Sequence, residues 1–437
     1  MYLFKNNRKY LLLNTKFKVV SMFIIILEMC ACFVLCLGQN KVKEPQYKMN
    51  LTKFSDSTGN FSIELLYHVG EQQEDQNFVL SPFAVWTTLA VTSEGAMGKT
   101  RQELLFALRF DRNSPRTSVR YYYQEIARWL VVNRTTAQFT KFNGIFMDRD
   151  EWQGIEDSFR QIAEKIYNTE AVNLNFKNNA AASTINRAVS LTTEDRIPTL
   201  IDESHLNNTH VLITSAVYFK GQWSSPFNDT TVKRDFFNSI GEKIGEVNMM
   251  YNRHTYPFAN ISELQASVIE LPYGVENHMS MILMLPNPGI TLKDMFLNFL
   301  KANLKTVFQE LRVSQEERGD IEIDCFIPRF RIVSNFELNE VLRYGSGIYD
   351  LFDPQKVVLG RLARRPIRGT KVIHKTEIDV TEESTTGGTP SVNTAPEFTN
   401  DSKVITFEAN RPFSYFIVEK HTNTIVLAGV YRKPILY

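Results

Sequence analysis

The chain has 437 residues, of which 43% are hydrophobic and 22% are charged, with 49 Lys and Arg against 48 Asp and Glu. This length and composition indicate a globular protein with one large core or two ordinary ones. A formal net charge of +1 provides no overall field for a polyanion, so nucleic-acid binding over the whole chain is excluded as a leading function.

The N-terminal segment has the features of a secretory signal. Basic residues between Lys5 and Lys18 precede an apolar run from Val19 to Leu37, and the small residue Gly38 follows. This order predicts a signal peptide at residues 1–38 and a secreted, extracellular protein. An uncleaved signal anchor stays open because the apolar run is long, although Glu28 disfavours stable residence in a membrane.

Cysteines and glycosylation sequons agree with secretion. After the predicted cleavage Cys325 is the sole cysteine, so no intrachain disulfide can form. We expect Cys325 to be a buried small apolar residue rather than a reactive thiol. N-glycosylation sequons begin at Asn50, Asn60, Asn133, Asn207, Asn228, Asn260 and Asn400.

The predicted elements change character along the chain. A polar lead at residues 39–49 is followed by helical periodicity at residues 61–69, 81–95, 99–110 and 156–168. From Val211 onward, β-branched and aromatic residues predict strands at 211–219, 267–274, 279–287, 321–332, 371–380, 413–420 and 423–431. Leading helices followed by strands, without a repeat period, indicate an α+β fold with large antiparallel or mixed sheets.

Motifs of the common enzyme classes were not found. The chain contains no G-x-S-x-G, H-E-x-x-H, P-loop or G-x-G-x-x-G sequence. His205 and His210 are five residues apart, but their LNNTH context is typical of a loop rather than of a metal-binding helix. We therefore expect a protein that is not an enzyme and that requires no metal or cofactor.

Six sequence blocks resemble successive signatures of the serpins. They are NFVLSPFAVWTTLAVTSEGAMGKT, VLITSAVYFKGQWSSPF, VIELPYGVENHMSMILMLPN, VIHKTEIDVTEES, FEANRPFSYFIVEK and NTIVLAGVYRKP. The resemblance covers residues 50–437 and implies a single, monomeric serpin domain with three β-sheets, eight or nine helices and an exposed reactive-centre loop. In inhibitory serpins a protease cleaves this loop, which then inserts into the main sheet and traps the acyl-linked protease.

The resemblance places the reactive-centre loop at about residues 382–405. Counting forward from Glu382 and backward from Arg411 both put the bait bond between Phe398 and Thr399. An aromatic residue at this position favours an extracellular chymotrypsin-like serine protease as the target. A glycan on Asn400 would obstruct docking of that protease.

The hinge of the loop has features for and against insertion. It comprises Glu382, Glu383, Ser384, Thr385, Thr386, Gly387, Gly388, Thr389 and Pro390. Strand alternation puts Thr385, Gly387, Thr389 and Ser391 on one side, and all four are small. Against insertion, Ser384 replaces the family's usual glycine, and two glycines with Pro390 cost a strand roughly 2–3 kcal/mol. A non-inhibitory serpin that binds an extracellular partner or ligand therefore remains the alternative to a protease trap.

The resemblance also identifies residues under the opening strands of the main sheet. These positions are Ser81, Ala84, Ser215 and His374, with Trp223 at the top of the sheet. Ala84 and Ser215 replace the family's serine and asparagine, which predicts that His374 is held less tightly than usual. Trp223 is equally compatible with an ordinary core aromatic.

A basic segment precedes the hinge. It contains Arg361, Arg364, Arg365, Arg368 and Lys371. Three interpretations remain open: a solvated loop, a site for a sulfated polysaccharide or protease exosite, and a processing site at residues 361–364.

Overall fold

The computed structural model describes residues 51–130, 137–149, 154–228, 231–276, 278–302, 304–319, 321–382 and 404–437. The predicted signal peptide, the polar lead and most of the predicted reactive-centre loop lie outside these residues. Leu51–Tyr437 form one compact unit. None of the helices in the described ranges has the length and hydrophobicity of a membrane span.

Helices dominate the first part of the unit, as the hydrophobic periodicity predicts. The α-helices are α2 (Leu51–Gln72), α3 (Pro82–Gly95), α4 (Gly98–Ala107), α5 (Arg116–Trp129), α6 (Asp157–Tyr167), α7 (Ala180–Thr192), α8 (Leu292–Phe299) and α9 (Leu304–Arg318). Three short helices add to them: η1 (Glu203–Leu206), η2 (Val341–Gly345) and η3 (Asp350–Phe352). The start of α3 is well defined because the Ser81 side chain accepts a hydrogen bond from the Ala84 amide and Pro82 opens the helix.

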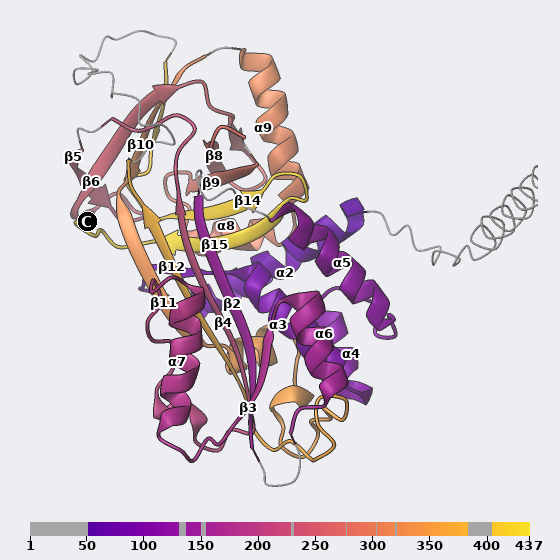
Figure 1. Cartoon of the computed structure of the whole chain (residues 1–437). Coiled ribbons are helices and arrows are strands. Elements are labelled where there is room, and N and C mark those ends of the chain that lie inside the picture. The colour runs from indigo at the N-terminus through magenta and orange to yellow at the C-terminus, as the bar shows by residue number, and fades with distance from the viewer. Residues whose placement is uncertain are drawn as a thin grey trace, which may run out of the picture. The chain divides into compact units, whose positions relative to one another are not determined.

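A five-stranded mixed sheet contains three long strands of 11 or 12 residues, β2, β4 and β12 (Figure 1). In spatial order its strands are β11 (Phe330–Glu337), β12 (Thr370–Val380), β4 (Val211–Gly221), β2 (Ala137–Asp148) and β3 (Glu170–Leu174). The β12–β4 and β2–β3 pairs are parallel, and the other two pairs are antiparallel.

Two further sheets complete the β structure that is described. The six-stranded sheet has the order β1 (Phe78–Leu80), β15 (Thr424–Tyr431), β14 (Phe413–Glu419), β9 (Met279–Pro286), β8 (Ala266–Tyr273) and β7 (Phe258–Ile261). The four-stranded sheet has the order β13 (Ile405–Glu408), β10 (Ile323–Pro328), β6 (Lys243–His254) and β5 (Val232–Phe237).

The two faces of the five-stranded sheet are covered differently. On one face α7 packs its apolar side chains against those of β2, β4 and β12, including Phe142 and Ala216. On the other face α3, whose residues are all buried, contacts β2 and β4 on one side and β15 of the six-stranded sheet on the other. Strand alternation therefore turns the odd-numbered residues of β4, such as Ser215, toward α3.

The predicted α+β fold and the three sheets are confirmed. Each predicted helix or strand coincides with an observed element, except that the stretch 321–332 contains two strands, β10 and β11, separated at Arg329. The sequence patterns did not single out α5, α7, α8, α9 or the strands β2, β3, β5, β6 and β7. Several of these elements position the sites described below.

Candidate functional site

The β12–β4 pair, which we call the seam, lies at the centre of the five-stranded sheet. The two strands are direct neighbours from Thr370 opposite Val211 to Asp379 opposite Lys220. The ladder is parallel, an arrangement slightly less stable per residue than an antiparallel one. Any strand that enters the sheet here must first separate this ladder.

A buried hydrogen bond crosses the middle of the seam. His374 of β12 and Ser215 of β4 face each other in register, and their Nδ1 and Oγ atoms are 2.7 Å apart. The His374 side chain is fully buried on the α3 side of the sheet. Because burial disfavours the imidazolium form, it lowers the pKa of His374 to about 3.

The second ring nitrogen of His374 is also occupied. Nε2 accepts the Ser81 backbone N–H at 2.8 Å and lies 2.6 Å from the Thr376 hydroxyl. Since Nε2 accepts, Nδ1 carries the proton and donates to Ser215. Both ring nitrogens of His374 therefore have partners: the serine at 215 is long enough to reach the ring, and Thr376 supplies a contact that the sequence analysis did not consider. That His374 is held less tightly than is usual in serpins stays a prediction.

Ser81 connects this histidine to the six-stranded sheet. Its hydroxyl donates to the Val426 carbonyl of β15 at 2.6 Å and accepts the Ala84 N–H at 3.2 Å. Ala84 is buried and contributes a methyl group but no side-chain hydrogen bond. The predicted gate residues Ser81, Ala84, Ser215 and His374 thus lie together, and three of the four belong to one polar network.

Trp223 holds the upper end of the seam. Its indole N–H donates to the Thr381 carbonyl at 2.7 Å, and its ring stacks on Tyr273 with centroids 4.5 Å apart. Thr381 directly follows β12 and precedes the predicted hinge. Trp223 is therefore more than a core aromatic, because it fixes the point at which the chain leaves the sheet.

The first hinge residue is anchored from two other elements. The Thr231 hydroxyl donates to the Glu382 carboxylate, and the guanidinium of Arg329 lies 3.7 Å from the same carboxylate. Arg329 occupies the break between β10 and β11, which joins the four-stranded and five-stranded sheets. The remaining hinge residues Glu383 to Pro390, the bait residues Phe398 and Thr399, and Asn400 lie outside the described residues.

Lys371 of the basic segment lies in β12, where its ammonium donates to the Ser204 carbonyl at 3.4 Å, and the four arginines before β12 divide into two groups. Arg364 pairs with Glu156 at 3.1 Å, and Arg365 donates to the Asp148 carbonyl. Arg361 and Arg368 are exposed. Leu362 and Ala363 are fully buried, which disfavours proteolytic processing at 361–364 because a protease needs an accessible, extended segment.

The other predicted sites have plain structural roles or are exposed. Cys325 of β10 is fully buried, and burial raises the pKa of its thiol far above the ordinary value, which confirms the apolar interpretation. His205 closes a capping box with Asp202, His210 accepts the Arg368 backbone N–H, and the described residues contain no cluster suited to a metal. Among the sequons, Asn60, Asn207 and Asn260 are exposed and Asn228 is half-buried, while Asn50 and Asn133 are not described.

Comparison with known proteins places the chain in a family. A sequence profile described as "Serpin (serine protease inhibitor)" matches residues 56–434. Human antithrombin-III is 29% identical over 393 residues, covering 87% of this chain and 82% of its own. Human serpin B9 is 27% identical over 395 residues, covering 87% of this chain and 99% of its own.

Solved structures agree in fold. Serpin-12 of Manduca sexta superimposes with a TM-score of 0.73 at 22% identity, over 86% of this chain and 98% of its own. Native protease nexin-1 with heparin gives a TM-score of 0.73 at 23% identity, over 88% of this chain and 100% of its own. The chain belongs to the serpin family, whose members are generally protease inhibitors rather than enzymes.

Proposed function

We propose that this chain is a secreted serpin that inhibits chymotrypsin-like serine proteases as a suicide substrate. In this proposal residues 50–437 form the single serpin domain, the target protease cleaves between Phe398 and Thr399, and the cleaved loop inserts into the seam. The protein is a monomer and uses no cofactor.

The direction of the seam carries the proposal. The chain leaves β12 at Thr381, beside the end of β4, and continues into the hinge at Glu382. A segment that turns back from this point and enters the seam would run antiparallel to β12. Because β4 is parallel to β12, it would also run antiparallel to β4. Insertion would thus replace one parallel ladder by two antiparallel ladders, which are the more stable kind.

The length and side chains of the loop are compatible with this movement. Residues Thr385 to Phe398 number fourteen and would extend about 45 Å as a strand. Thr385, Gly387, Thr389 and Ser391 would face one side of the sheet, where small residues fit beneath a covering helix. A hinge penalty of roughly 2–3 kcal/mol would slow insertion about 30- to 160-fold. We therefore expect part of the protein to be turned over as substrate.

Complex formation with proteases tests the proposal. The secreted protein is incubated with trypsin, a chymotrypsin-like and an elastase-like protease, and SDS-stable complexes are sought by electrophoresis. The expected result is a complex with the chymotrypsin-like protease that Phe398→Ala abolishes and Phe398→Arg transfers to trypsin. Lys403→Ala is the control and should leave the complex unchanged. Cleavage after Lys403 accompanied by complex formation would show that the bait position is wrong.

A non-inhibitory serpin is the second candidate, and the hinge sequence favours it. Ser384, Gly387, Gly388 and Pro390 depart from the family's usual hinge, and the seam is closed by the fully hydrogen-bonded His374. Under this candidate every protease would cleave the loop without forming a complex, and Pro390→Ala would change nothing. Under the inhibitory proposal Pro390→Ala raises the trapped fraction, because alanine restores a ladder hydrogen bond.

Secretion is part of the same proposal. The order of basic, apolar and small residues at 1–38 supports secretion, and N-terminal sequencing of protein from culture medium should begin near Gln39. Protein retained on membranes with an intact N-terminus would instead indicate the signal anchor.

Sulfated polysaccharide is proposed as a partner of the basic segment. Arg361 and Arg368 are exposed there, and the similar protease nexin-1 was solved with heparin. The double variant R361A/R368A should elute from a heparin column at lower salt than the wild type. Arg364 and Arg365 already have an acidic and a carbonyl partner, so the double variant R364A/R365A should shift elution less. Equal elution of all three proteins would argue against this site.

A further inference from the structure

A pocket at one edge of the five-stranded sheet has no role in the proposed inhibition. It has a volume of about 160 Å³ and is lined by residues of β2, α6, the start of β3 and the end of α7. Strand β3 pairs with β2 from Gly144 onward. In the described part of the chain, the preceding half of this β2 edge, Ala137 to Asn143, has no neighbouring strand. The pocket opens at this uncovered edge.

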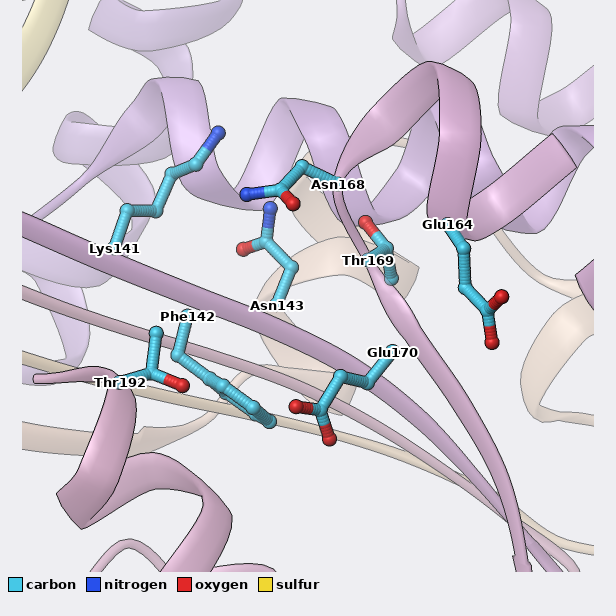
Figure 2. A pocket seen from close by; sticks show the side chains of 8 residues that line it. All are labelled: Lys141, Phe142, Asn143, Glu164, Asn168, Thr169, Glu170 and Thr192. Carbon is cyan, nitrogen blue, oxygen red and sulfur yellow. The ribbon is translucent and has the colours of Figure 1, made fainter. Parts of the chain in front are cut away.

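Two polar side chains of β2 point into the pocket on the α3 side of the sheet (Figure 2). Asn143 is 2% exposed, and neither its amide nitrogen nor its amide oxygen has a hydrogen-bond partner. A buried amide without partners usually costs about 1–3 kcal/mol of stability. Such a group in a native fold calls for a bound water or ligand.

Lys141 lies two residues before Asn143 on the same face of β2. Its ammonium nitrogen is 5.0 Å from the centroid of Phe83 and 5.6 Å from that of Tyr123. Among the described residues, the ammonium group contacts these two aromatic rings, and no carboxylate lies within ion-pair distance of it. Burial lowers the pKa of Lys141 to about 8. An anion beside the ammonium would relieve this unfavourable burial.

The nitrogen atoms in the pocket converge. In Figure 2 the amide nitrogens of Asn143 and Asn168 are drawn toward each other, and the ammonium of Lys141 extends on the same side of β2. Asn168 ends α6 in the left-handed conformation (φ 47°), which turns the chain from that helix into β3. Three convergent N–H donors are suited to a group with several acceptor oxygens.

The carboxylates of the pocket limit the charge of the occupant. Glu170 and Thr192 lie on the opposite side of β2 together with Phe142 (Figure 2). Glu164 is exposed at the pocket rim, and burial together with Glu164 raises the pKa of Glu170. With one ammonium and two carboxylates elsewhere on its lining, the pocket favours a monoanion over a dianion. The free oxygen of Asn143 requires a donor in addition, which a hydroxyl group next to a carboxylate would supply.

We propose that this pocket binds a small hydroxy acid, whose carboxylate lies between Lys141, Asn143 and Asn168 and whose hydroxyl contacts the Asn143 oxygen. The volume sets the size, because a cavity of about 150 Å³ accommodates a molecule as large as benzene, so about six non-hydrogen atoms fit. Asn143 is the direct cross-strand neighbour of Ser215 on β4, so the pocket lies one strand away from the seam.

Thermal shift with L-lactate tests the site in the full secreted protein. The melting temperature is measured from 0 to 50 mM sodium lactate at constant ionic strength, with chloride, acetate and sulfate as comparison anions. We expect 50 mM lactate to raise the melting temperature by about 2–4 °C, the shift produced by a ligand whose dissociation constant is about 1 mM. Acetate should raise the melting temperature less, and sulfate should match chloride. A larger effect of sulfate than of lactate would overturn the hydroxy-acid assignment, and equal effects of lactate and chloride would overturn the site.

Three variants locate the binding. Lys141→Met keeps the size of the side chain but removes the charge of a half-buried group, so it should melt no lower than the wild type while binding lactate at least tenfold more weakly. Asn143→Leu should also lose the response. Lys165→Met removes an exposed charge from α6 nearby and should respond like the wild type. A full response in Lys141→Met, or a lost response in Lys165→Met, would contradict the proposal.

Discussion

The seam and the six-stranded sheet differ in the direction of their strand pairing and in the polarity of the side chains that they bury. Strands β14 and β15 are buried at every residue, pair antiparallel with each other, and are flanked by further antiparallel partners. The seam is a parallel ladder that carries the buried polar residues Ser215, His374 and Thr376 at its centre. The six-stranded sheet thus combines apolar burial with antiparallel pairing, whereas the seam combines the slightly less stable parallel pairing with polar side chains at its centre.

Cleavage of the loop should produce the largest effect on this comparison. If the loop enters the seam, the weak parallel joint disappears and the five-stranded sheet gains a central strand. We expect chymotrypsin cleavage at Phe398 to raise the melting temperature by at least about 10 °C, the shift that several kcal/mol of added stability produces. Melting curves of intact and cleaved protein give the answer.

Neighbouring hinge positions provide a matched control for cleavage. Thr385 would face the core after insertion and Thr386 would face away, because strand side chains alternate. Thr385→Arg should therefore be cleaved without the rise in melting temperature, while Thr386→Arg should retain most of it. Equal behaviour of the two variants would show that the loop does not enter as an ordinary strand.

A cavity in the six-stranded sheet should have a large effect of the opposite kind. Ile417 of β14 is fully buried, and Ile417→Ala should lower the free energy of unfolding by about 2–5 kcal/mol. We expect the same loss in the intact and the cleaved protein, since this sheet does not change when the seam opens. Denaturant unfolding measures this loss. The control is Val232→Ala, because Val232 is 47% exposed and its truncation should cost little. A loss confined to the intact form would mean that the two sheets are not independent.

The pH dependence of stability isolates the centre of the seam. The pKa of His374 falls from about 6.5 in the unfolded chain to about 3 in the fold, so between these values the unfolded chain binds the extra proton. Stability is therefore complete above pH 6.5 and declines as the pH falls toward 3, by at most about 1.4 kcal/mol per pH unit. At pH 4.5 this single titration should have lowered the free energy of unfolding by about 2–3 kcal/mol relative to its value above pH 6.5.

Substitution of the histidine should remove this dependence. His374→Gln should flatten the stability profile between pH 6.5 and 4.5 by up to one proton, measured by urea unfolding at each pH. His278→Gln, at an exposed position, should keep the wild-type slope. An unchanged slope in His374→Gln would show that the buried ring does not report on the closed seam.

The loop base should show the smallest effect. Arg329 and Glu382 are 3.7 Å apart, with side chains that are 39% and 15% exposed. Such a pair is worth less than about 1 kcal/mol, and a double-mutant cycle with Arg329→Gln and Glu382→Gln should give a coupling of that size. Trp223→Phe, which loses the buried bond to Thr381, should be more destabilising than either. A coupling above about 2 kcal/mol would make this ion pair, rather than Trp223, the main anchor of the hinge.

The local sequence predicted individual helices and strands better than it predicted contacts between residues that are distant in the chain. Ser81, Pro82 and the apolar residues after them predict α3, and the β-branched run from Val211 predicts β4, because capping and periodicity are properties of neighbouring residues. The gate residues could be named because the resemblance supplied their positions. The strength of the His374 network could not, since it depends on whether the serine at 215 reaches a ring that lies 159 residues away in sequence.

Capping, periodicity and the family blocks in the sequence predicted α3, β4 and the other elements with strong local signals, and they give Phe398 as the predicted bait residue beyond a hinge of small side chains. Tertiary structure alone decided that β12 lies parallel to β4, that Arg329 meets Glu382, and that Lys141 and Asn143 share a pocket with Asn168. The physical reason is the range of the interactions. Periodicity, caps and turn residues act over a few positions, whereas strand order, burial and the partners of a polar side chain follow from how distant segments pack.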